Sequence, residues 1–498
     1  MKRMILIFLA LLLTFSTMLG MVSCNKDDEN TPVDTSDNGG DEVKGEYDED
    51  GFLNDDLPDL DYNLANISML VWEDVTMQEF EAEGLNGQAI NDAIYYRNLE
   101  AEARLNVEFS YTEKAGHAVE DWFNTCEIDY SSGSKAYHIY ATYSRTFATL
   151  ATRGFLVDLK QTTYLDLEKP WWPEGLRDNC TINNKLYFAS GDISSNALWM
   201  MHCIFVNEDA ADSWRVFEEK QLYDIINDGE WTLDLMLSMC KDVFENRDGD
   251  DAVTSGDFFA FTAQAVNLNL FSTGSGLLCM AKDEDDALII SDSLASEKMI
   301  SVINKTRQIA YADNAYVQDG IDGRKVFCAQ NALFHVDKLF VLRGKDNQNA
   351  DQTAISFDVL IAPSPKYSES QKEYYTAVGA PFTMYGINNL LDASTVDMLS
   401  AALECLASES YRQVTPIIFE ESLKLRYSKD DVTSKMFDTI RNGVVYDIGE
   451  IFDISLSYIP STIFVNQVKQ GSTTIASDWV GQKPVVEKLI GKIMEKFQ

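Results

Sequence analysis

The architecture of this chain follows from two stretches, NISMLVWEDV (residues 66–75) and NGQAINDAIYYRNLEAEARLNVEFS (residues 86–110). The apolar runs from Ile67 to Trp72 and from Val107 to Ser110 predict two strands. A helix is expected between them, because five residues recur with the period of one helix face. These residues are Ile90, Ala93, Ile94, Arg97 and Ala101. The pattern is strand, helix, strand.

The same pattern repeats further along the chain. AYHIYATYS (136–144) predicts a strand, RTFATLATRGF (145–155) a helix, and LVDL (156–159) another strand. Repeated units of this kind favour the α/β class, with a mostly parallel sheet covered by helices on both faces. Ligands of such sheets bind at the carboxyl ends of the strands, which here means near Trp72 and near residues 142–145.

Length and charge narrow the function. A chain of 498 residues with 45% hydrophobic residues is long enough for two or three lobes with sizeable cores. Its 80 acidic and 40 basic residues give a formal net charge of -40. Because such a surface repels phosphate backbones, we expect no nucleic-acid partner.

The N-terminus predicts export. Lys2 and Arg3 precede an apolar run from Met4 to Met21 that has the length of a signal peptide. The residues before Cys24 resemble a lipoprotein signal box, which implies that residues 1–23 are removed and that lipid on Cys24 anchors the protein to the outer face of the cell membrane. An ordinary secretory peptide is the alternative. Later apolar runs are too short to span a bilayer.

An acidic spacer is expected to follow the anchor, from residue 24 to residue 61. Residues 25–60 hold fourteen acidic residues and two lysines and almost no large apolar residues. Such a segment cannot form a core and predicts a disordered, extended tether. The seven cysteines after Cys24 are scattered, with no Cys-x-x-Cys spacing, so we expect small buried residues such as Cys203 and Cys405 rather than a metal or redox site.

Eight segments, in order from about residue 62 to the C-terminus, together resemble the family 1 extracellular solute-binding proteins of ABC transporters. They are AINDAIYYRNLEAEARLNV (89–107), ATRGFLVDL (151–159), YLDLEKPWW (164–172), NNKLYFASGDIS (183–194), FVNEDA (205–210), DGEWTLDLML (228–237), FDVLIAPSPKYSESQKEYYT (357–376) and TPIIFEESLKLRYSKDD (415–431). The resemblance implies a two-lobe, periplasmic-binding-protein-like fold of class II, whose lobes close on a sugar or oligosaccharide. It also implies a receptor that delivers this ligand to the permease subunits of an ABC transporter.

By this resemblance the lobes are discontinuous in sequence and joined by a hinge. The first lobe is expected to take residues 62–191 and 362–394, and the second residues 196–357 and 395–498. KLYFASGDISSNALWMMHCIFVN (185–207) fits the first crossing, with the hinge at residues 190–195 around Gly191. Trp171 and Trp172 are expected to pack under this hinge rather than to stack on ligand.

Sugar recognition needs flat aromatic faces for C–H patches and polar groups for hydroxyls. In the first lobe the candidates that follow strands are Trp72, Glu73, Tyr143 and Arg145. Arg145 stands where sugar-binding relatives commonly carry an acid, so it favours an anionic sugar or pairs with a neighbouring acid. Asp192 either reaches the cleft or caps its own turn.

In the second lobe, the resemblance puts Asn267, Phe271 and His335 along the cleft, with ordinary core packing as the alternative for each. A separate acidic loop, NRDGDDAVTSGD (246–257), partly fits a calcium loop. Its candidate ligands are Asn246, Asp248, Asp250, Thr254 and Asp257. Because Asp251 stands where a calcium loop needs glycine for its sharp turn, a plain acidic turn is the alternative. Structural Ca²⁺ is the one cofactor that the sequence suggests.

No catalytic motif for metal, acyl-transfer or phosphate chemistry occurs in the sequence, so we expect a binding protein rather than an enzyme. The prediction is a monomeric, lipid-anchored carbohydrate receptor that works with an ABC permease. Two other functions stay open. One is a surface glycan-binding lipoprotein without a transporter, which CNKDDE (24–29) favours because it resembles a surface-export signal. The other is a glycoside hydrolase, since paired carboxylates are easily found among 80 acids.

Overall fold

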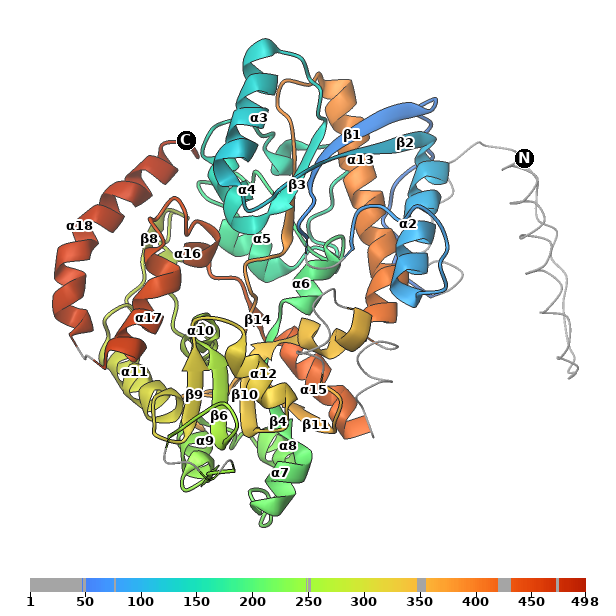
Figure 1. The fold of residues 1–498 in the computed structure, drawn as a ribbon. Helices are drawn as coiled ribbons and strands as arrows, with labels where there is room; N and C mark the ends of the chain where they lie inside the picture. Colours follow the sequence, from blue (N-terminus) through green and yellow to red (C-terminus); the bar gives the residue numbers. More distant parts are fainter. Residues whose placement is uncertain are drawn as a thin grey trace, which may run out of the picture. The chain divides into compact units, whose positions relative to one another are not determined.

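The computed structural model describes residues 47, 51–75, 78–247, 249, 252–346, 355–419, 431–471 and 474–498. The predicted signal peptide, Cys24 and most of the spacer lie outside these residues. Residues from Glu46 to Gln498 form one compact unit, and all of the elements below belong to it (Figure 1). Among the described helices, none is long and apolar enough to cross a membrane.

The first sheet has the strand order β13-β3-β1-β2. Its strands are β1 (Ala65–Trp72), β2 (Val107–Lys114), β3 (Ile139–Tyr143) and β13 (Thr383–Ile387). β1 is parallel to both β2 and β3, and β13 runs antiparallel to β3. The strand, helix, strand unit predicted from residues 66–110 is therefore confirmed, with α2 (Ala89–Leu105) as its helix.

Helix α2 buries the face that its sequence period predicts. Ala93, Ile94, Arg97 and Ala101 are all buried, whereas Ile90 at the first turn is half-buried. The helix ends at Asn106, whose left-handed backbone (φ 52°) turns the chain directly into β2. The other helices near the first sheet are α3 (Val119–Ser132), α4 (Ser144–Ala151), α5 (Glu174–Cys180) and α13 (Ala393–Glu409).

The second sheet has the order β11-β4-β10-β6-β5, with β9 also paired to β6. Its strands are β4 (His202–Asn207), β5 (Phe244–Glu245), β6 (Phe258–Gln264), β9 (Ala315–Gln318), β10 (Ala332–Lys338) and β11 (Val359–Ala362). β6 is parallel to β9 and β10, and β4 is antiparallel to β10 and β11. Both faces are buried, because Cys203 and Phe205 enter one apolar cluster while Ile204 and Val206 enter another.

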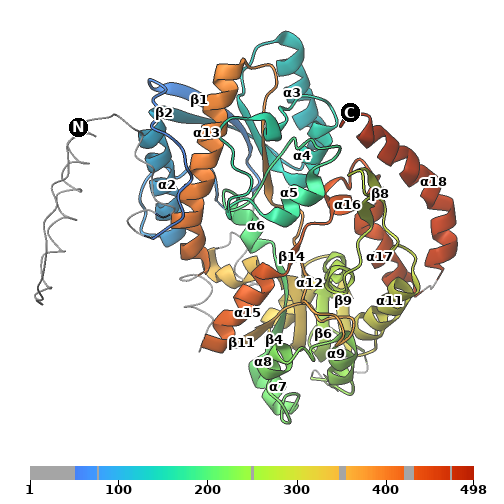
Figure 2. The same ribbon diagram turned by 180° about the vertical axis from the view of Figure 1, so that it is seen from behind.

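The remaining elements complete the unit (Figure 2). Two small sheets pair β7 (Met280–Lys282) with β8 (Leu288–Ile290) and β12 (Thr376–Ala377) with β14 (Val444–Val445). In the described part of the chain, the remaining α-helices are α6 (Ser195–Trp199), α7 (Glu208–Ser213), α8 (Leu222–Asn227), α9 (Leu233–Cys240), α10 (Asn269–Gly274), α11 (Glu297–Ala310), α12 (Asp322–Cys328), α15 (Asp431–Asn442), α16 (Ile448–Ile451), α17 (Ile459–Gln470) and α18 (Ile475–Met494).

The chain first passes from one sheet to the other between Ala189, which bridges to Tyr385 of β13, and the start of β4. Gly191 lies in this connection, and a Cβ there would stand 2.0 Å from the carbonyl oxygen of Trp171. Glycine is therefore required by a close approach of backbones rather than by a positive φ. Trp171 and Trp172 are buried against this segment, which confirms the predicted core packing. Movement at residues 190–195 stays a prediction.

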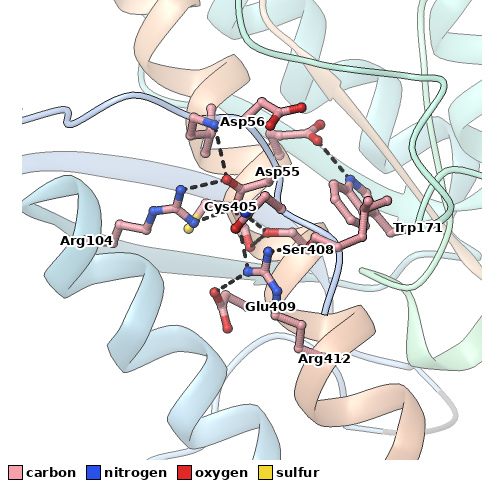
Figure 3. A network of polar contacts seen from close by, with 12 residues as sticks. Asp55, Asp56, Arg104, Trp171, Cys405, Ser408, Glu409 and Arg412 are labelled. Atoms are coloured by element: carbon pink, nitrogen blue, oxygen red, sulfur yellow. Dashed lines mark hydrogen bonds and ion pairs between the residues drawn. The ribbon is translucent and has the colours of Figure 1, made fainter. Parts of the chain in front are cut away.

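The acidic spacer is shorter than its predicted end at residue 61, because residues 51–60 pack on the body. Leu57 is buried in the core. The buried carboxylate of Asp55 accepts hydrogen bonds from both terminal nitrogens of Arg104, at 2.6 Å for Nη2, and from Ser408 at 2.9 Å (Figure 3). Because this segment joins α2 to α13, a body without it would expose Arg104 and apolar surface.

Helix α13 packs against α2 and therefore beside the first sheet. The prediction assigned residues 395–409 to the second lobe, and the structure differs because α13 returns to the first sheet directly after β13. Further along, α15 packs on β11 of the second sheet. The chain thus crosses between the sheets more than once after residue 362.

Candidate functional site

An aromatic pair lies at the carboxyl ends of β1 and β3. The ring centroids of Trp72 and Tyr143 are 5.7 Å apart at 43°. Trp72 is buried, and its indole nitrogen donates to Thr383 Oγ1 at 2.8 Å. Tyr143 is only half-buried, so it presents more surface than Trp72, which supports it from behind. Glu73 is exposed at the start of the next loop.

Arg145 is the second residue of α4 and lies just after this pair, and its side chain is 17% exposed. Its Nη1 lies 3.3 Å from Asp453 Oδ2, and its Nη2 lies 3.6 Å from Glu450 Oε2. Of the two alternatives for Arg145, pairing with neighbouring acids is the one that the structure contains. The buried Nε has no hydrogen-bond partner in the described part of the chain.

The carboxylates around Arg145 come from a late segment of the chain. Glu450 lies in α16, which contacts α4 on one side and α17 and β7 on the other. Asn269 donates to Glu450 Oε1 at 3.2 Å, and Ser461 donates to Asp453 Oδ2 at 2.7 Å. Arg145 therefore connects an element of the first sheet to residues that are bonded to helices beside the second sheet.

Acidic groups outweigh basic ones at this point. Burial, and repulsion by Asp447 and Asp453, raise the pKa of Glu450 to about 7, although Arg145 favours its charged form. Burial also raises the pKa of Asp447 to about 6. Since the one guanidinium faces several carboxyl groups, the arrangement does not suit a ligand with several negative charges.

A second polar cluster lies where β6 and β10 end. Asn267 is buried, and its Oδ1 accepts a hydrogen bond from Lys338 Nζ at 2.9 Å. Its Nδ2 donates to Asp337 Oδ1 at 3.2 Å, and Arg324 Nε donates to Asp337 Oδ2 at 2.6 Å. Burial lowers the pKa of Lys338, and its neighbouring charges include Glu450 and Arg145 as well as Asp337 and Arg324. The two polar clusters are therefore close enough to interact electrostatically.

Two of the sequence candidates in the second lobe lie in the core. Phe271 is fully buried with its ring 6.1 Å from that of Phe261. His335 is also fully buried, with Nδ1 2.9 Å from Thr262 Oγ1 and Nε2 3.3 Å from Asp337 Oδ2. Neither offers surface to a ligand in this conformation. His335 instead contacts Asp337, which belongs to the second polar cluster.

Asp192 lies in the connection between the sheets and not beside Arg145. Its Oδ1 accepts a hydrogen bond from Thr415 at 3.0 Å and lies 3.3 Å from Arg441 Nη2. Its Oδ2 is buried without a partner among the described residues, and burial raises the pKa of the carboxyl group to about 6. Because Arg441 belongs to α15, which packs on β11, this ion pair fastens the connection to the second sheet.

A hollow of about 690 Å³ opens beside Trp72. Aromatic and polar side chains line it, including Trp72, Tyr111, Asn91 and Glu113. At its back, the buried Glu79 accepts hydrogen bonds from Asn196 Nδ2 at 2.7 Å and from the Tyr385 hydroxyl group at 3.0 Å. This carboxylate joins the loop after β1 to α6, so the hollow extends from the strand end toward the connection.

The site residues that the sequence did not reveal come mainly from DIGEIFDISLSYIP (447–460). Glu450 and Asp453 pair with Arg145 across about 300 positions, a separation that no local pattern connects. Tyr458, in the same stretch, is 50% exposed. Ser457 and Tyr458 both have φ near 60°, which is an unusual conformation for residues other than glycine. Lys338, the last residue of β10, was not among the predicted site residues either.

The candidate calcium loop is partly outside the described residues, which exclude Asp248 and Asp250. Asn246 lies in the loop, and the carboxylate of Asp257 accepts hydrogen bonds from the backbone N–H of Thr254 at 2.9 Å and of residue 247 at 3.1 Å. Among the described positions, no three His, Cys, Asp or Glu side chains are grouped as metal ligands would be. A Ca²⁺ site stays a prediction.

Known proteins resemble this chain in structure and not in sequence. No protein-family model matches the chain, and no curated protein matches its sequence. The galacto-N-biose-/lacto-N-biose I-binding protein of the ABC transporter from Bifidobacterium longum, in complex with lacto-N-biose, aligns with a TM-score of 0.55 at 13% identity, covering 86% of this chain and 98% of its own. A cyclo/maltodextrin-binding protein complexed with maltotetraose aligns with a TM-score of 0.52 at 13% identity, covering 86% and 97%.

An uncharacterized protein from Listeria monocytogenes aligns with a TM-score of 0.56 at 8% identity, over 86% of this chain and 100% of its own. The chain has the fold of the ABC-transporter solute-binding proteins. The two-lobe α/β fold expected from the sequence is confirmed. In this solute-binding-protein fold we call the first sheet with its helices the first lobe, and the second sheet with its helices the second lobe.

Proposed function

We propose that the protein is a lipid-anchored extracytoplasmic receptor that binds a neutral oligosaccharide between its lobes and delivers it to an ABC permease. The observation that carries this proposal is the meeting of Tyr143 and Arg145, at the strand ends of the first lobe, with Glu450, Asp453 and the Lys338 cluster. An aromatic face combined with charged hydrogen-bonding groups is what sugar rings and their hydroxyls require.

The charges support a neutral ligand. Arg145 is already paired with Asp453 and Glu450, and Lys338 lies beside Asp337. A uronic acid would add a negative charge to a region that already holds several carboxyl groups. A neutral sugar hydroxyl instead donates to a carboxylate and accepts from the guanidinium, so it exchanges hydrogen bonds without changing the net charge.

Closure of the lobes provides the signal to the permease. A ligand that contacts both lobes stabilises the closed state by the difference between its affinities for the closed and the open form. Arg145 and its carboxylate partners are suited to this, since they approach one another only when the elements that carry them are close. Solved relatives of the same fold bind lacto-N-biose and maltotetraose, which supports sugar as the ligand class.

Replacing Arg145 or Trp72 by alanine is expected to weaken binding of the sugar at least tenfold. Arg145→Ala removes charged hydrogen bonds worth roughly 1.5–3 kcal/mol, and Trp72→Ala removes the support of the Tyr143 ring. Isothermal titration with the neutral oligosaccharide that most stabilises the protein measures both effects. Lys483→Ala, on the exposed surface of α18, is the matched control and should bind as the unmodified chain does.

Thermal unfolding of each variant checks that affinity, and not folding, has changed. Unchanged affinity in both Arg145→Ala and Trp72→Ala would place the ligand elsewhere and would contradict this site. If instead the titrated sugar is hydrolysed, the protein is an enzyme and the receptor function is wrong.

A further inference from the structure

An exposed tryptophan lies at the far end of the second lobe. Trp214 follows α7 and is 37% exposed. It packs near the start of β6, whereas Asn267 of the interlobe site follows the end of that strand. In both views α7 lies at the end of the second sheet away from the elements of the first sheet (Figures 1 and 2). Trp214 is therefore separate from the site described above.

The indole of Trp214 is held in a fixed orientation. It stacks on the buried ring of Phe258 with the centroids 6.1 Å apart and the planes at 15°. The guanidinium of Arg247 lies 4.6 Å from the centre of the same Phe258 ring. The next residue, Arg215, turns the chain away with a left-handed φ of 55°. A stacked, immobilised ring loses little entropy when a flat ligand face covers it.

Two hollows share Trp214 as a border. One measures about 570 Å³ and is lined by Phe244, Asp209 and Gln330 among others. The other measures about 700 Å³ and runs along Val216, Lys220 and neighbouring residues. Asp209 and Gln330 are exposed, and Gln330 has a left-handed φ of 63° at the turn before β10. Carboxylate and amide groups therefore lie at the edge of an aromatic surface.

The charge around these hollows is nearly balanced. Six carboxylates and four cationic side chains line the two together. A polyanion such as nucleic acid or an acidic lipid surface needs an excess of cations, which is absent from these linings. A neutral chain of sugar rings requires what is present, namely a flat aromatic face, hydrogen-bonding groups beside it and room on more than one side of the ring.

We propose that Trp214 is the platform of a second carbohydrate-binding site, at the end of the second lobe remote from the interlobe site, which takes a neutral polysaccharide or long oligosaccharide. One ring stacks on the indole, and the flanking rings lie in the two hollows, where Asp209 and Gln330 bind hydroxyl groups. This site does not depend on the interlobe site, and it would hold a polymer near a receptor that imports its fragments.

Affinity electrophoresis of the full-length chain in detergent tests the proposal. Native gels contain one neutral polysaccharide each, a mixed-linkage β-glucan, a branched α-glucan, a galactomannan or an arabinoxylan, and a parallel gel contains polygalacturonate. We expect at least one neutral polymer to retard the unmodified chain and polygalacturonate to leave it unaffected. Trp214→Ala should raise the apparent dissociation constant at least tenfold, and Trp214→Phe, which keeps a flat ring, should raise it less.

Two further variants make the result specific. Asp209→Ala should weaken retardation without removing any core residue, which keeps the test valid if Trp214→Ala folds poorly. Arg145→Ala should be retarded like the unmodified chain, although it binds the transported sugar at least tenfold more weakly. The proposal is overturned if no neutral polymer retards the chain, or if Trp214→Ala and Asp209→Ala migrate as the unmodified chain does. The proposal is also overturned if Arg145→Ala is no longer retarded whereas Trp214→Ala and Asp209→Ala still are. That result would assign the polymer to the interlobe site.

Discussion

Replacing Asp337 by alanine is expected to lower the free energy of unfolding by about 3–5 kcal/mol, since it removes the one carboxylate of a buried ion pair. Asp337 accepts hydrogen bonds from Arg324, Asn267 and the buried His335. Although burial acts to raise its pKa, the hydrogen bond from His335 and the charges of Arg324 and Lys338 hold the pKa of Asp337 well below its usual range. Without it two cations would remain partly or fully buried and uncompensated.

Urea unfolding at neutral pH measures this loss. Asp337→Asn should destabilise less than Asp337→Ala, because the amide oxygen still accepts a hydrogen bond. The matched control is Asp319→Ala, which removes the partner of Lys469 at an exposed ion pair and should leave stability unchanged within error. Equal effects at positions 337 and 319 would show that the cluster beneath the site is not structural.

Replacing Glu404 is expected to have the second large effect. This fully buried carboxyl group accepts hydrogen bonds from the indole nitrogens of Trp171 and Trp172, both at 2.9 Å, and from the backbone of Asp166 at 3.2 Å. At pH 5, Glu404→Leu should lower stability by roughly 3 kcal/mol, because two buried indole N–H groups and the half-buried N–H of Asp166 lose their acceptor. Chemical unfolding of the variant, compared with Glu404→Gln, measures the effect. The prediction would be contradicted if Glu404→Leu lowered the free energy of unfolding by less than Glu404→Gln does.

The same group makes stability depend on pH. Burial raises the pKa of Glu404 to about 8, even though the Trp172, Asp166 and Trp171 N–H groups favour its charged form. The folded state binds the proton of Glu404 more tightly than the unfolded state does. The resulting contribution of Glu404 to the free energy of unfolding is therefore complete below pH 4.5 and is lost as pH rises toward 8. A shift of this size corresponds to on the order of 5 kcal/mol.

The free energy of unfolding of Glu404→Gln should therefore depend less on pH than that of the unmodified chain. Between pH 5 and pH 8 the variant should become steadily more stable relative to the unmodified chain. Parallel pH profiles for the two proteins would show that Glu404 is charged in the folded state. The comparison is internal, so the many other titrating groups of this acidic chain contribute equally to both curves.

The apolar runs and the helical periodicity of residues 66–110 were sufficient to predict the first parallel unit, since β1, α2 and β2 are neighbours in the sequence. The first passage of the chain between the two sheets could also be predicted, because Gly191 and the two tryptophans that pack against it lie within about twenty residues of one another in the sequence. The position of α13 could not be predicted from the sequence, since its apolar faces fit either lobe. Only its packing against α2 assigns it to the first lobe.

Part of the candidate site could be predicted because some of its residues lie close to a strand end in the sequence. Tyr143 ends β3 and Arg145 lies two residues further on, so the rule that ligands bind at strand ends made both of them candidates. Glu450 and Asp453 lie in a short helix and the turn after it, where no period or motif marks them. The resemblance implied a position along the cleft for His335, yet its place in β10 turns the side chain into the core.

A neutral oligosaccharide is expected to bind between the two lobes. The most direct test is thermal unfolding of residues 46–498 by intrinsic fluorescence, against neutral mono- and oligosaccharides, uronic acids and Ca²⁺ with and without chelator. The chain begins at residue 46 because residues 51–60 belong to the folded body. A ligand at a hundred times its dissociation constant stabilises the native state by about 2.7 kcal/mol. We predict that at least one neutral oligosaccharide raises Tm, is recovered intact, and has a smaller effect on Arg145→Ala. A screen in which no sugar raises Tm, or in which the stabilising sugar is consumed, would contradict the account.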